Sequence, residues 1–170
     1  MILKNNNILI KIIILELIIS ISGCYSFTGG SLPSHLKTIY IPYAEDQTLS
    51  GEPNLKEFFT ESIIQKFRND NTLQISDQSN ANCRLDCVII SLNDSPAIIE
   101  AKEAVATRRI SITVKAVFRD LLYNKAIFEK NFNSYVDYNS QNAVIERSEA
   151  IKKTLDFIAE DILFETISNW

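Results

Sequence analysis

The most reactive side chains of this sequence are three cysteines, Cys24, Cys83 and Cys87, and a single histidine, His35. A thiol can be acylated, joined in a disulfide or used as a metal ligand. A zinc site needs about four ligands. One histidine and two closely spaced cysteines do not supply enough ligands for such a site. The chemistry of the chain therefore depends on what its three thiols do.

Cys83 and Cys87 are separated by four positions. On one extended strand they would face the same way about 13 Å apart, at ~3.3 Å per residue. A disulfide needs Cα atoms within about 7 Å, so the two would pair only if the chain turned between them. The polar segment Asn80–Asn82 allows a turn close to Cys83. The spacing favours two free thiols, with a disulfide as the alternative.

Residues 1–23 have the composition of a secretory signal peptide. Lys4 gives a basic start, and the apolar run Ile8–Ile21 that follows is interrupted only by Lys11 and Glu16. A basic start, a short apolar run and small residues at its end are typical of such a signal. The run has 14 residues, whereas a spanning helix needs roughly 20. A retained membrane anchor is therefore the less favoured alternative.

The sequence Ile21-Ser22-Gly23-Cys24 resembles a lipobox, with isoleucine in place of the usual leucine. The resemblance implies that Cys24 is acylated, with palmitate among the acyl chains, and that the chain is cut before it. Stable anchoring takes at least two acyl chains, and a lipoprotein cysteine carries two or three. We therefore expect residues 24–36 to be a lipidated cysteine and its tether. The alternative is an ordinary thiol after an ordinary signal.

The residue after the lipidated cysteine bears on the choice of membrane. An aspartate at this position resembles an inner-membrane retention signal in some bacteria, and the sequence has Tyr25 instead. The predicted location is therefore the outer membrane, on its periplasmic face.

Catalytic patterns are missing from the mature chain. The histidine of a hydrolytic triad would have to be His35, which lies close to Pro33 in the tether. The sequence also has no strand-to-helix elbow that would present a nucleophilic serine, so it does not indicate a Ser-His-Asp triad. The mature chain contains only three glycines and no phosphate-binding loop. We therefore expect that the protein is not an enzyme, and that it has no metal site and no cofactor apart from the covalent lipid on Cys24.

The charge of the mature chain argues against nucleic acid as a partner. The whole chain has 17 basic and 21 acidic residues, and removal of Lys4, Lys11 and Glu16 leaves 15 and 20, a net charge of −5. An acidic domain without basic runs binds nucleic acid poorly. With 147 residues, Cys24–Trp170 is long enough to bury its own core as one domain.

Residues 37–170 are predicted to form this single domain. Strands are predicted over Thr38–Tyr43, Leu73–Ser76, Arg84–Leu92, Arg109–Arg119 and Ile127–Val136, and helices over Asn54–Arg68 and Asn142–Ser168. This order predicts an α+β fold with two helices packed on one face of a mainly antiparallel four- to five-stranded sheet.

The central strands differ in their apolar patterns. Arg84–Leu92 is almost continuously apolar in its middle, which predicts burial on both faces. Arg109–Arg119 alternates strictly between apolar and polar residues, which predicts a strand with one buried and one solvent-exposed face. Asn93–Arg108 is predicted to be a long connection, and Tyr123–Lys125 a hairpin turn.

The two helices are predicted from caps and apolar stripes. Asn54 and Glu57 have the spacing of a capping box at the first helix. The core stripe of the second helix is predicted to consist of Val144, Ser148, Ile151, Leu155, Ile158 and Ile162. Phe157 and Phe164 fall on its opposite, mostly charged side. They indicate either a curved, partly covered helix or a surface for a partner.

These features, taken in order, resemble the LptE family of lipopolysaccharide-assembly lipoproteins. The resemblance covers Cys24–Trp170 and rests on Cys24–Phe27, Thr38–Tyr43, Leu55–Phe67, Arg109–Val114, Phe132–Tyr138 and Asn169–Trp170. It implies a subunit of the lipopolysaccharide transport translocon, which sits inside an LptD-like outer-membrane β-barrel as its plug and folding partner. Members of the family also bind lipopolysaccharide.

A phosphorylated headgroup would need Lys or Arg side chains. The candidates are Lys102, Arg108 and Arg109, which are close together in the sequence, with solvated loop charges as the alternative. Two other function classes remain open. One is a lipid-anchored periplasmic module that pilots another barrel or a secretin, and the other is a carrier of a small hydrophobic ligand with an enclosed apolar cavity.

Overall fold

The computed structural model describes residues 32–97 and 107–168, so the signal peptide, Cys24 and Lys102 lie outside the described residues. The elements in chain order are β1 (Thr38–Tyr40), β2 (Glu45–Asp46), α2 (Leu55–Asp70), β3 (Gln74–Ile75), β4 (Cys83–Pro96), β5 (Thr107–Asp120), β6 (Lys125–Asn139), the 3₁₀ turn η1 (Ser140–Asn142) and α3 (Ala143–Ser168). Within the described part, no helix is long and apolar enough to cross a membrane.

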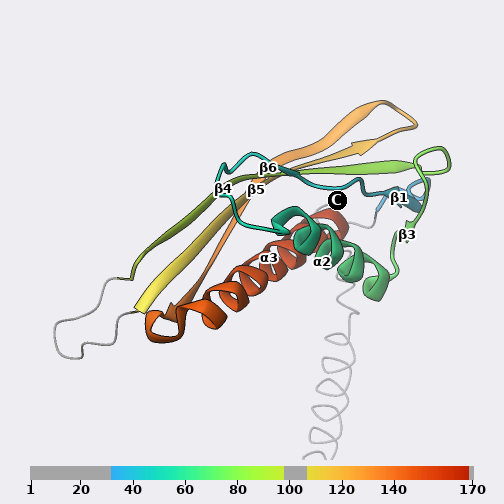
Figure 1. The fold of residues 1–170 in the computed structure, drawn as a ribbon. Coiled ribbons are helices and arrows are strands. Elements are labelled where there is room, and N and C mark those ends of the chain that lie inside the picture. Colours follow the sequence, from blue (N-terminus) through green and yellow to red (C-terminus); the bar gives the residue numbers. More distant parts are fainter. Residues whose placement is uncertain (1–31, 98–106, 169–170) are drawn as a thin grey trace, which may run out of the picture.

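A single mixed sheet forms one layer, and two helices form the other. The strand order is β3-β1-β4-β5-β6, and β2 also pairs with β4. The three long strands β4, β5 and β6 are antiparallel, whereas the short strands β1, β2 and β3 add parallel pairs at the edge. Both α2 and α3 lie on the same face of the sheet (Figure 1). The predicted α+β architecture is therefore confirmed, with six strands in the sheet.

Alternation along β5 explains why one face of the sheet is buried. Ile110, Ile112 and Val114 point toward the helices and are fully buried, while Ser111 and Thr113 are half-buried on the other face. The predicted one-sided burial of this strand is confirmed. The face without helices is called the open face below.

The prediction that β4 is buried on both faces is wrong. Leu85, Cys87 and Ile89 are buried, but the intervening residues are only half-buried, so β4 has the same open face as β5. The continuous apolar run arises because Val88 and Ile90, between and after the buried residues, are apolar but only half-buried. Ile90 is the extra residue at a register shift between Ile89 and Ser91.

The connection between β4 and β5 is shorter than predicted. β4 continues to Pro96 and β5 already begins at Thr107, so both ends of the predicted connection Asn93–Arg108 belong to strands. At the other end of β5, the hairpin turn is where the sequence placed it, and Asn124 takes a left-handed backbone conformation with φ 49°.

Helix α2 begins without the predicted capping box. Asn54 is left-handed, with φ 59°, and its side chain makes no capping hydrogen bond. A capping side chain needs an extended backbone at this position, which the left-handed turn does not provide. The apolar stripe of this helix was predicted to contain Leu55, Phe58, Phe59, Ile63 and Phe67; all are buried except Phe58, which is half-buried.

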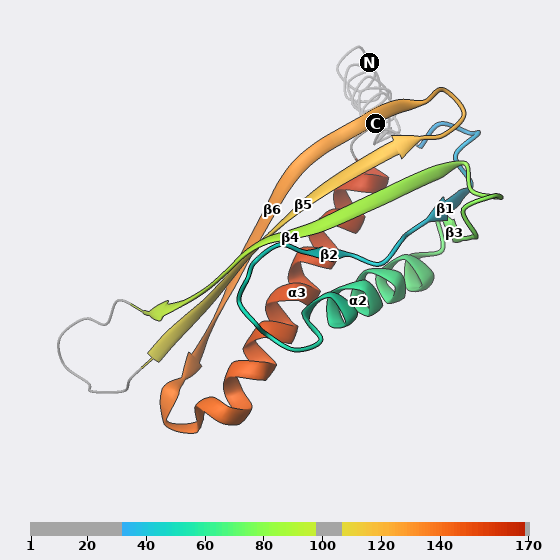
Figure 2. The same ribbon diagram turned by 45° about the horizontal axis from the view of Figure 1, so that its top comes forward.

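Helix α3 runs along the length of the long strands (Figure 2). Ile151, Leu155, Ile158 and Ile162 are buried as predicted. Val144 was also predicted to be in the core, but it is 94% exposed. In the first turns of α3, the half-buried Arg147 reaches the polar partners Asp94 and Glu52, whereas Val144 points to solvent.

Candidate functional site

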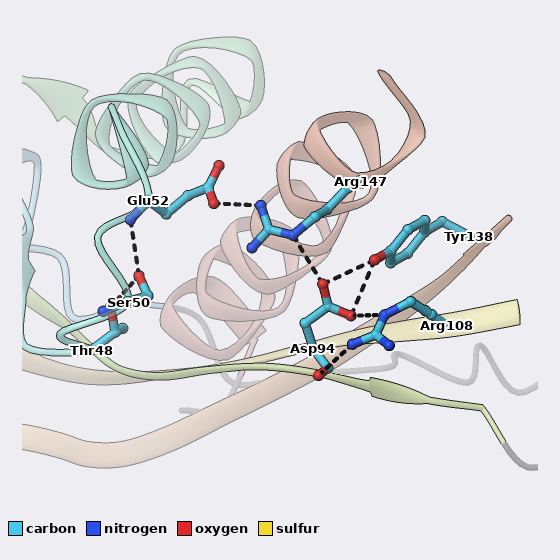
Figure 3. A network of polar contacts seen from close by, with 7 residues as sticks. All are labelled: Thr48, Ser50, Glu52, Asp94, Arg108, Tyr138 and Arg147. Carbon is cyan, nitrogen blue, oxygen red and sulfur yellow. Dashed lines mark hydrogen bonds and ion pairs between the residues drawn. The ribbon is translucent and has the colours of Figure 1, made fainter. Parts of the chain in front are cut away.

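A polar cluster closes the far end of the sheet, where β4 ends and β5 begins. Asp94 on β4 is its centre: it accepts hydrogen bonds from Arg108 Nε at 2.8 Å, from the Tyr138 hydroxyl at 2.9 Å and from Arg147 Nε at 2.9 Å (Figure 3). The donors come from β5, β6 and α3, so one carboxylate connects four elements. This cluster is called the Asp94 network below.

The loop before α2 is joined to the same network. Arg147 Nη1 donates to Glu52 Oε2 at 2.5 Å while its Nε donates to Asp94. Glu52 in turn lies in a loop held by short polar contacts, in which its N–H donates to Ser50 Oγ at 3.3 Å (Figure 3). Arg147 therefore bridges the sheet and the loop that leads into α2.

The network keeps Asp94 ionised. Burial of the carboxyl group raises its pKa, but hydrogen bonds from Arg108, Tyr138 and Arg147 outweigh this effect, so the pKa of Asp94 is lower than its usual value. Burial also raises the pKa of Tyr138 above its ordinary value, and its hydrogen bond to Asp94 acts in the same direction. Both shifts describe a charged acceptor held by donors, an arrangement that fixes structure.

The two candidate arginines on β5 point to opposite faces of the sheet. Arg108 faces α3 and belongs to the Asp94 network, whereas Arg109 lies on the open face. There it donates two hydrogen bonds to Asp137, from Nε to Oδ1 at 2.6 Å and from Nη2 to Oδ2 at 2.9 Å. Its guanidinium carbon lies 4.0 Å from the Tyr135 ring centroid. The two therefore do not form one patch, and Lys102 lies outside the described residues.

The open face of the long strands is mainly polar, although Val88 and Val117 also lie on it. Its charged side chains pair across strands, as in Lys115 with Glu129 and Arg109 with Asp137. Tyr135, which is 57% exposed, is the large apolar side chain beside Arg109. Such a surface offers hydrogen bonds and charge, and it suits a wet environment or a polar ligand.

The two phenylalanines predicted to lie outside the core of α3 are exposed. Phe157 is 40% exposed and Phe164 64%, and the Lys153 ammonium lies 5.7 Å from the Phe157 ring centroid. Their exposure agrees with the sequence analysis, and their role as a partner surface stays a prediction.

A second polar cluster, which the sequence analysis missed, lies at the opposite end of the sheet. His35 Nε2 is 2.6 Å from Asp120 Oδ2, and Asp120 also accepts the backbone N–H groups of Leu122 and Tyr123. The end of the segment predicted to be a tether is therefore fixed to the β5–β6 turn. An aspartate directly before a turn was the available signal, since its side chain often accepts the backbone N–H two residues on.

The described residues contain little that resembles a catalytic site. Within residues 32–97 and 107–168, no group of three His, Cys, Asp or Glu side chains could hold a metal ion. Cys83 and Cys87 lie on one strand as buried free thiols, as the spacing favoured. A groove of about 540 Å³ beside the start of α2 is open and lined mainly by polar residues, unlike the enclosed apolar cavity expected of a lipid carrier.

The fold and its clusters together define a small α+β domain with a mainly polar sheet face and ion-pair networks that hold its ends. The family model for LptE, lipopolysaccharide assembly, matches residues 36–165, and the chain belongs to this family. Its role is therefore in lipopolysaccharide assembly, and it is a non-enzymatic assembly lipoprotein rather than an enzyme.

Solved structures share the fold at low sequence identity. The protein CT253 from Chlamydia trachomatis is 11% identical with a TM-score of 0.56, covering 78% of this chain and 99% of that one. A minor lipoprotein from Acinetobacter baumannii is 13% identical with a TM-score of 0.53, covering 76% and 91%. Protein XCC0632 from Xanthomonas campestris is 9% identical with a TM-score of 0.55, covering 80% and 88%. Among curated proteins, none matches the sequence.

Proposed function

We propose that this protein is the outer-membrane lipoprotein subunit of a lipopolysaccharide transport translocon, where it serves as plug and folding partner of an LptD-like β-barrel. The observation that carries the proposal is the LptE family match over residues 36–165, which spans almost the whole described domain. The lipid on Cys24 would hold the domain on the periplasmic face of the outer membrane.

The polar open face supports a position inside a barrel lumen. The lumen of a large outer-membrane barrel is wet and polar, so a plug needs polar outer surfaces in place of an apolar belt. The open face meets this need, because Lys115, Glu129 and Arg109 lie there in paired charges. Its remaining side chains include Ser111, Thr113, Asn131 and Asn133, which complete a hydrogen-bonding surface.

The length of the strands supports an orientation along the barrel axis. β5 has 14 residues and a contour length of roughly 46 Å at ~3.3 Å per residue, longer than the ~30 Å hydrocarbon core of a bilayer. With the tether at one end, the opposite end carries Arg108 and Arg109. A domain placed along the membrane normal would then present these arginines far from the leaflet that holds its lipid.

Arg109 is the best placed of the three candidates for a lipopolysaccharide phosphate. It lies on the open face, and a guanidinium can bind two phosphate oxygens at once. A phosphate at Arg109 would replace one partner, Asp137, which lies on the same open face. Arg108 is held by Asp94 on the helix side, so a phosphate would have to displace part of the network. We therefore expect Arg109→Ala to weaken lipopolysaccharide binding more than Arg108→Ala does.

Lipopolysaccharide binding is tested with purified protein and four variants. The triple variant Lys102→Ala, Arg108→Ala, Arg109→Ala should lose most of the binding, Arg109→Ala alone a large share of it, and Arg108→Ala alone less. Arg84→Ala is the matched control, because Arg84 lies on the open face near the other end and pairs with Asp86. Unchanged binding by the triple variant would refute the headgroup assignment.

The translocon assignment is tested by affinity purification of the tagged, lipidated protein from detergent-solubilised outer membranes, with mass spectrometry of the proteins that accompany it. A stoichiometric LptD-like barrel is the expected result. A secretin or an unrelated barrel would replace the proposal with the piloting alternative. Intact mass of the purified protein checks separately that residues 1–23 are removed and that Cys24 carries acyl chains.

A further inference from the structure

The turn that joins β5 and β6 exposes three consecutive large apolar residues. Leu121, Leu122 and Tyr123 are 38%, 65% and 69% exposed. Tight turns usually favour Gly, Asn, Asp and Ser, and only Asn124 fits that preference here. Exposed apolar side chains grouped in one place on a surface indicate a contact with another molecule or with a membrane. These three residues are called the apolar tip below.

Hydrogen bonds hold the backbone of the apolar tip. The Asp120 carboxylate accepts the N–H groups of Leu122 at 2.8 Å and of Tyr123 at 3.1 Å. The N–H of Leu121 donates to the carbonyl oxygen of Asn82 at 2.9 Å. Each residue of the tip thus has its backbone fixed from inside the fold. The three side chains are consequently presented outward by an ordered turn.

The same cluster fixes the chain that leads to the lipid. His35 Nε2 lies 2.6 Å from Asp120 Oδ2, and the edge of its ring meets the Tyr123 ring with centroids 5.1 Å apart. In Figure 2 the blue start of the described chain lies beside the β5–β6 turn. The exit point of the tether and the apolar tip are therefore one place on the molecule.

Chain length brings the tip close to the membrane surface. The described chain begins at Leu32, which packs against the core. Cys24 precedes Leu32 by eight residues, and eight residues span at most roughly 28 Å when fully extended. If Cys24 carries lipid, as the proposed function holds, the tip cannot move far from the leaflet that contains this lipid.

The composition around the tip matches a membrane interface. Lys125 follows the tip and Lys37 follows the His35 segment, and both are exposed. Tyrosine is enriched at the headgroup level, where its ring is buried and its hydroxyl stays hydrated. Lysine ammonium groups are attracted to anionic headgroups. The combination of two leucines, a tyrosine and flanking lysines suits the boundary between headgroups and acyl chains.

We propose that the apolar tip is a second membrane contact, which inserts Leu121, Leu122 and Tyr123 into the phospholipid leaflet that holds the lipid on Cys24. Two contacts on one end of the domain fix its orientation, whereas a lipid on a tether alone leaves the domain free to rotate. The far end of the sheet, with the Asp94 network, then points away from that leaflet. This inference rests on the proposed lipid anchor for its geometry.

The insertion depth of the tip is measured with a tryptophan probe in the lipidated mature protein. Tyr123→Trp is combined with Trp170→Phe, and the protein is reconstituted in vesicles of phosphatidylethanolamine with a minority of phosphatidylglycerol. Brominated acyl chains should quench the probe, most strongly with bromines roughly 5–10 Å below the headgroups. The control is Tyr135→Trp in the same background, because Tyr135 is similarly exposed but lies on the open face. Equal quenching of the two probes, or none at Tyr123→Trp, would overturn the proposal.

A second measurement separates the tip from the lipid anchor. The mature chain with Cys24→Ser has no acylation site, and its partition onto the same vesicles depends on the protein surface alone. Leu122→Asp should reduce this partition by roughly tenfold or more, since a charge replaces an apolar side chain that inserts into the membrane. Leu49→Asp is the control, because Leu49 is 99% exposed in the loop before α2. Equal partition of both variants would refute insertion of the apolar tip into the membrane. If the intact mass of the unsubstituted protein showed no lipid, only the proposed lipid anchor on Cys24 would be refuted.

Discussion

Asp94 of β4 and Arg147 of α3 are joined by a 2.9 Å hydrogen bond across 53 residues of sequence. The same carboxylate accepts from Arg108 and Tyr138, and the same guanidinium reaches Glu52. This network of ion pairs and hydrogen bonds therefore fixes the start of α3 against the ends of three long strands and against the loop before α2. At this end of the sheet, Val144 and Ile145 of α3 point outward.

Asp94→Asn should destabilise the domain by about 1–3 kcal/mol, because the charge that attracts two guanidinium groups is lost while those groups stay half-buried. The free energy of unfolding, measured in urea by circular dichroism, gives this value. Asp137→Asn is the matched control, since Asp137 forms a more exposed pair with Arg109 and exposed pairs contribute at most about 1 kcal/mol. A loss for Asp94→Asn no larger than that of the control would show that the Asp94 network contributes no more than an exposed ion pair.

Stability should fall at acidic pH because of Asp120 and Asp94. For Asp120, burial raises the pKa, but bonds from His35 and from the Tyr123 and Leu122 N–H groups lower it below the ordinary value of 3.8. A carboxyl group with a lower pKa in the folded state stabilises the fold above its unfolded pKa, and this contribution disappears as the pH falls through the folded pKa. The urea midpoint should therefore decrease from about pH 5 downward. Asp120→Asn should show a weaker decrease, and an unchanged pH profile would contradict this role.

Cys83 and Cys87 should be inert toward alkylating reagents in the folded protein. Burial raises the pKa of the Cys83 thiol from 9.0 to about 12, with a smaller contribution from Asp120, and burial likewise raises the pKa of Cys87. Three pKa units reduce the thiolate of Cys83 roughly a thousandfold. Mass spectrometry after maleimide treatment should find no adduct on either residue in native protein and two in urea without reductant. No adducts in urea would instead reveal a disulfide.

The elements that the sequence predicted well are those whose signal is local. The alternation in β5 and the stripe Ile151 to Ile162 in α3 repeat with the period of the element that carries them. The capping box at Asn54 failed because spacing does not determine the backbone conformation of the capping residue, which is left-handed. β4 was misread because Val88 and Ile90 are apolar although they are only half-buried, so residue type alone did not show which side chains face the core.

The two polar clusters could not be predicted from spacing. His35 and Asp120 are 85 residues apart, and Arg147 and Glu52 are 95 apart, so their contacts depend on the tertiary fold. Arg108 and Arg109 were treated as one site because they are adjacent in sequence. On a strand, adjacent side chains point to opposite faces, and only the extension of β5 back to Thr107 shows that this rule applies to them.

The outer side of α3 should be an interface with the barrel. Phe164 is 64% exposed, and aromatic side chains often carry much of the affinity of an interface. Phe164→Glu should reduce capture of the barrel by roughly tenfold or more, since a buried anchor would be replaced by a charge. Its free energy of unfolding should change by less than about 0.5 kcal/mol, because the side chain is largely outside the core.

Val144→Glu provides the comparison for Phe164→Glu on the same helix. Val144 is 94% exposed and lies in the first turn of α3. It precedes Phe164 by about five and a half turns at 3.6 residues per turn, so its variant adds the same charge at a distant place. Co-purification of the barrel from outer membranes measures both variants, and urea unfolding confirms that both are folded. If the two variants capture the barrel equally well, Phe164 is a partly covered residue of a curved helix, and the interface lies on another face of the domain.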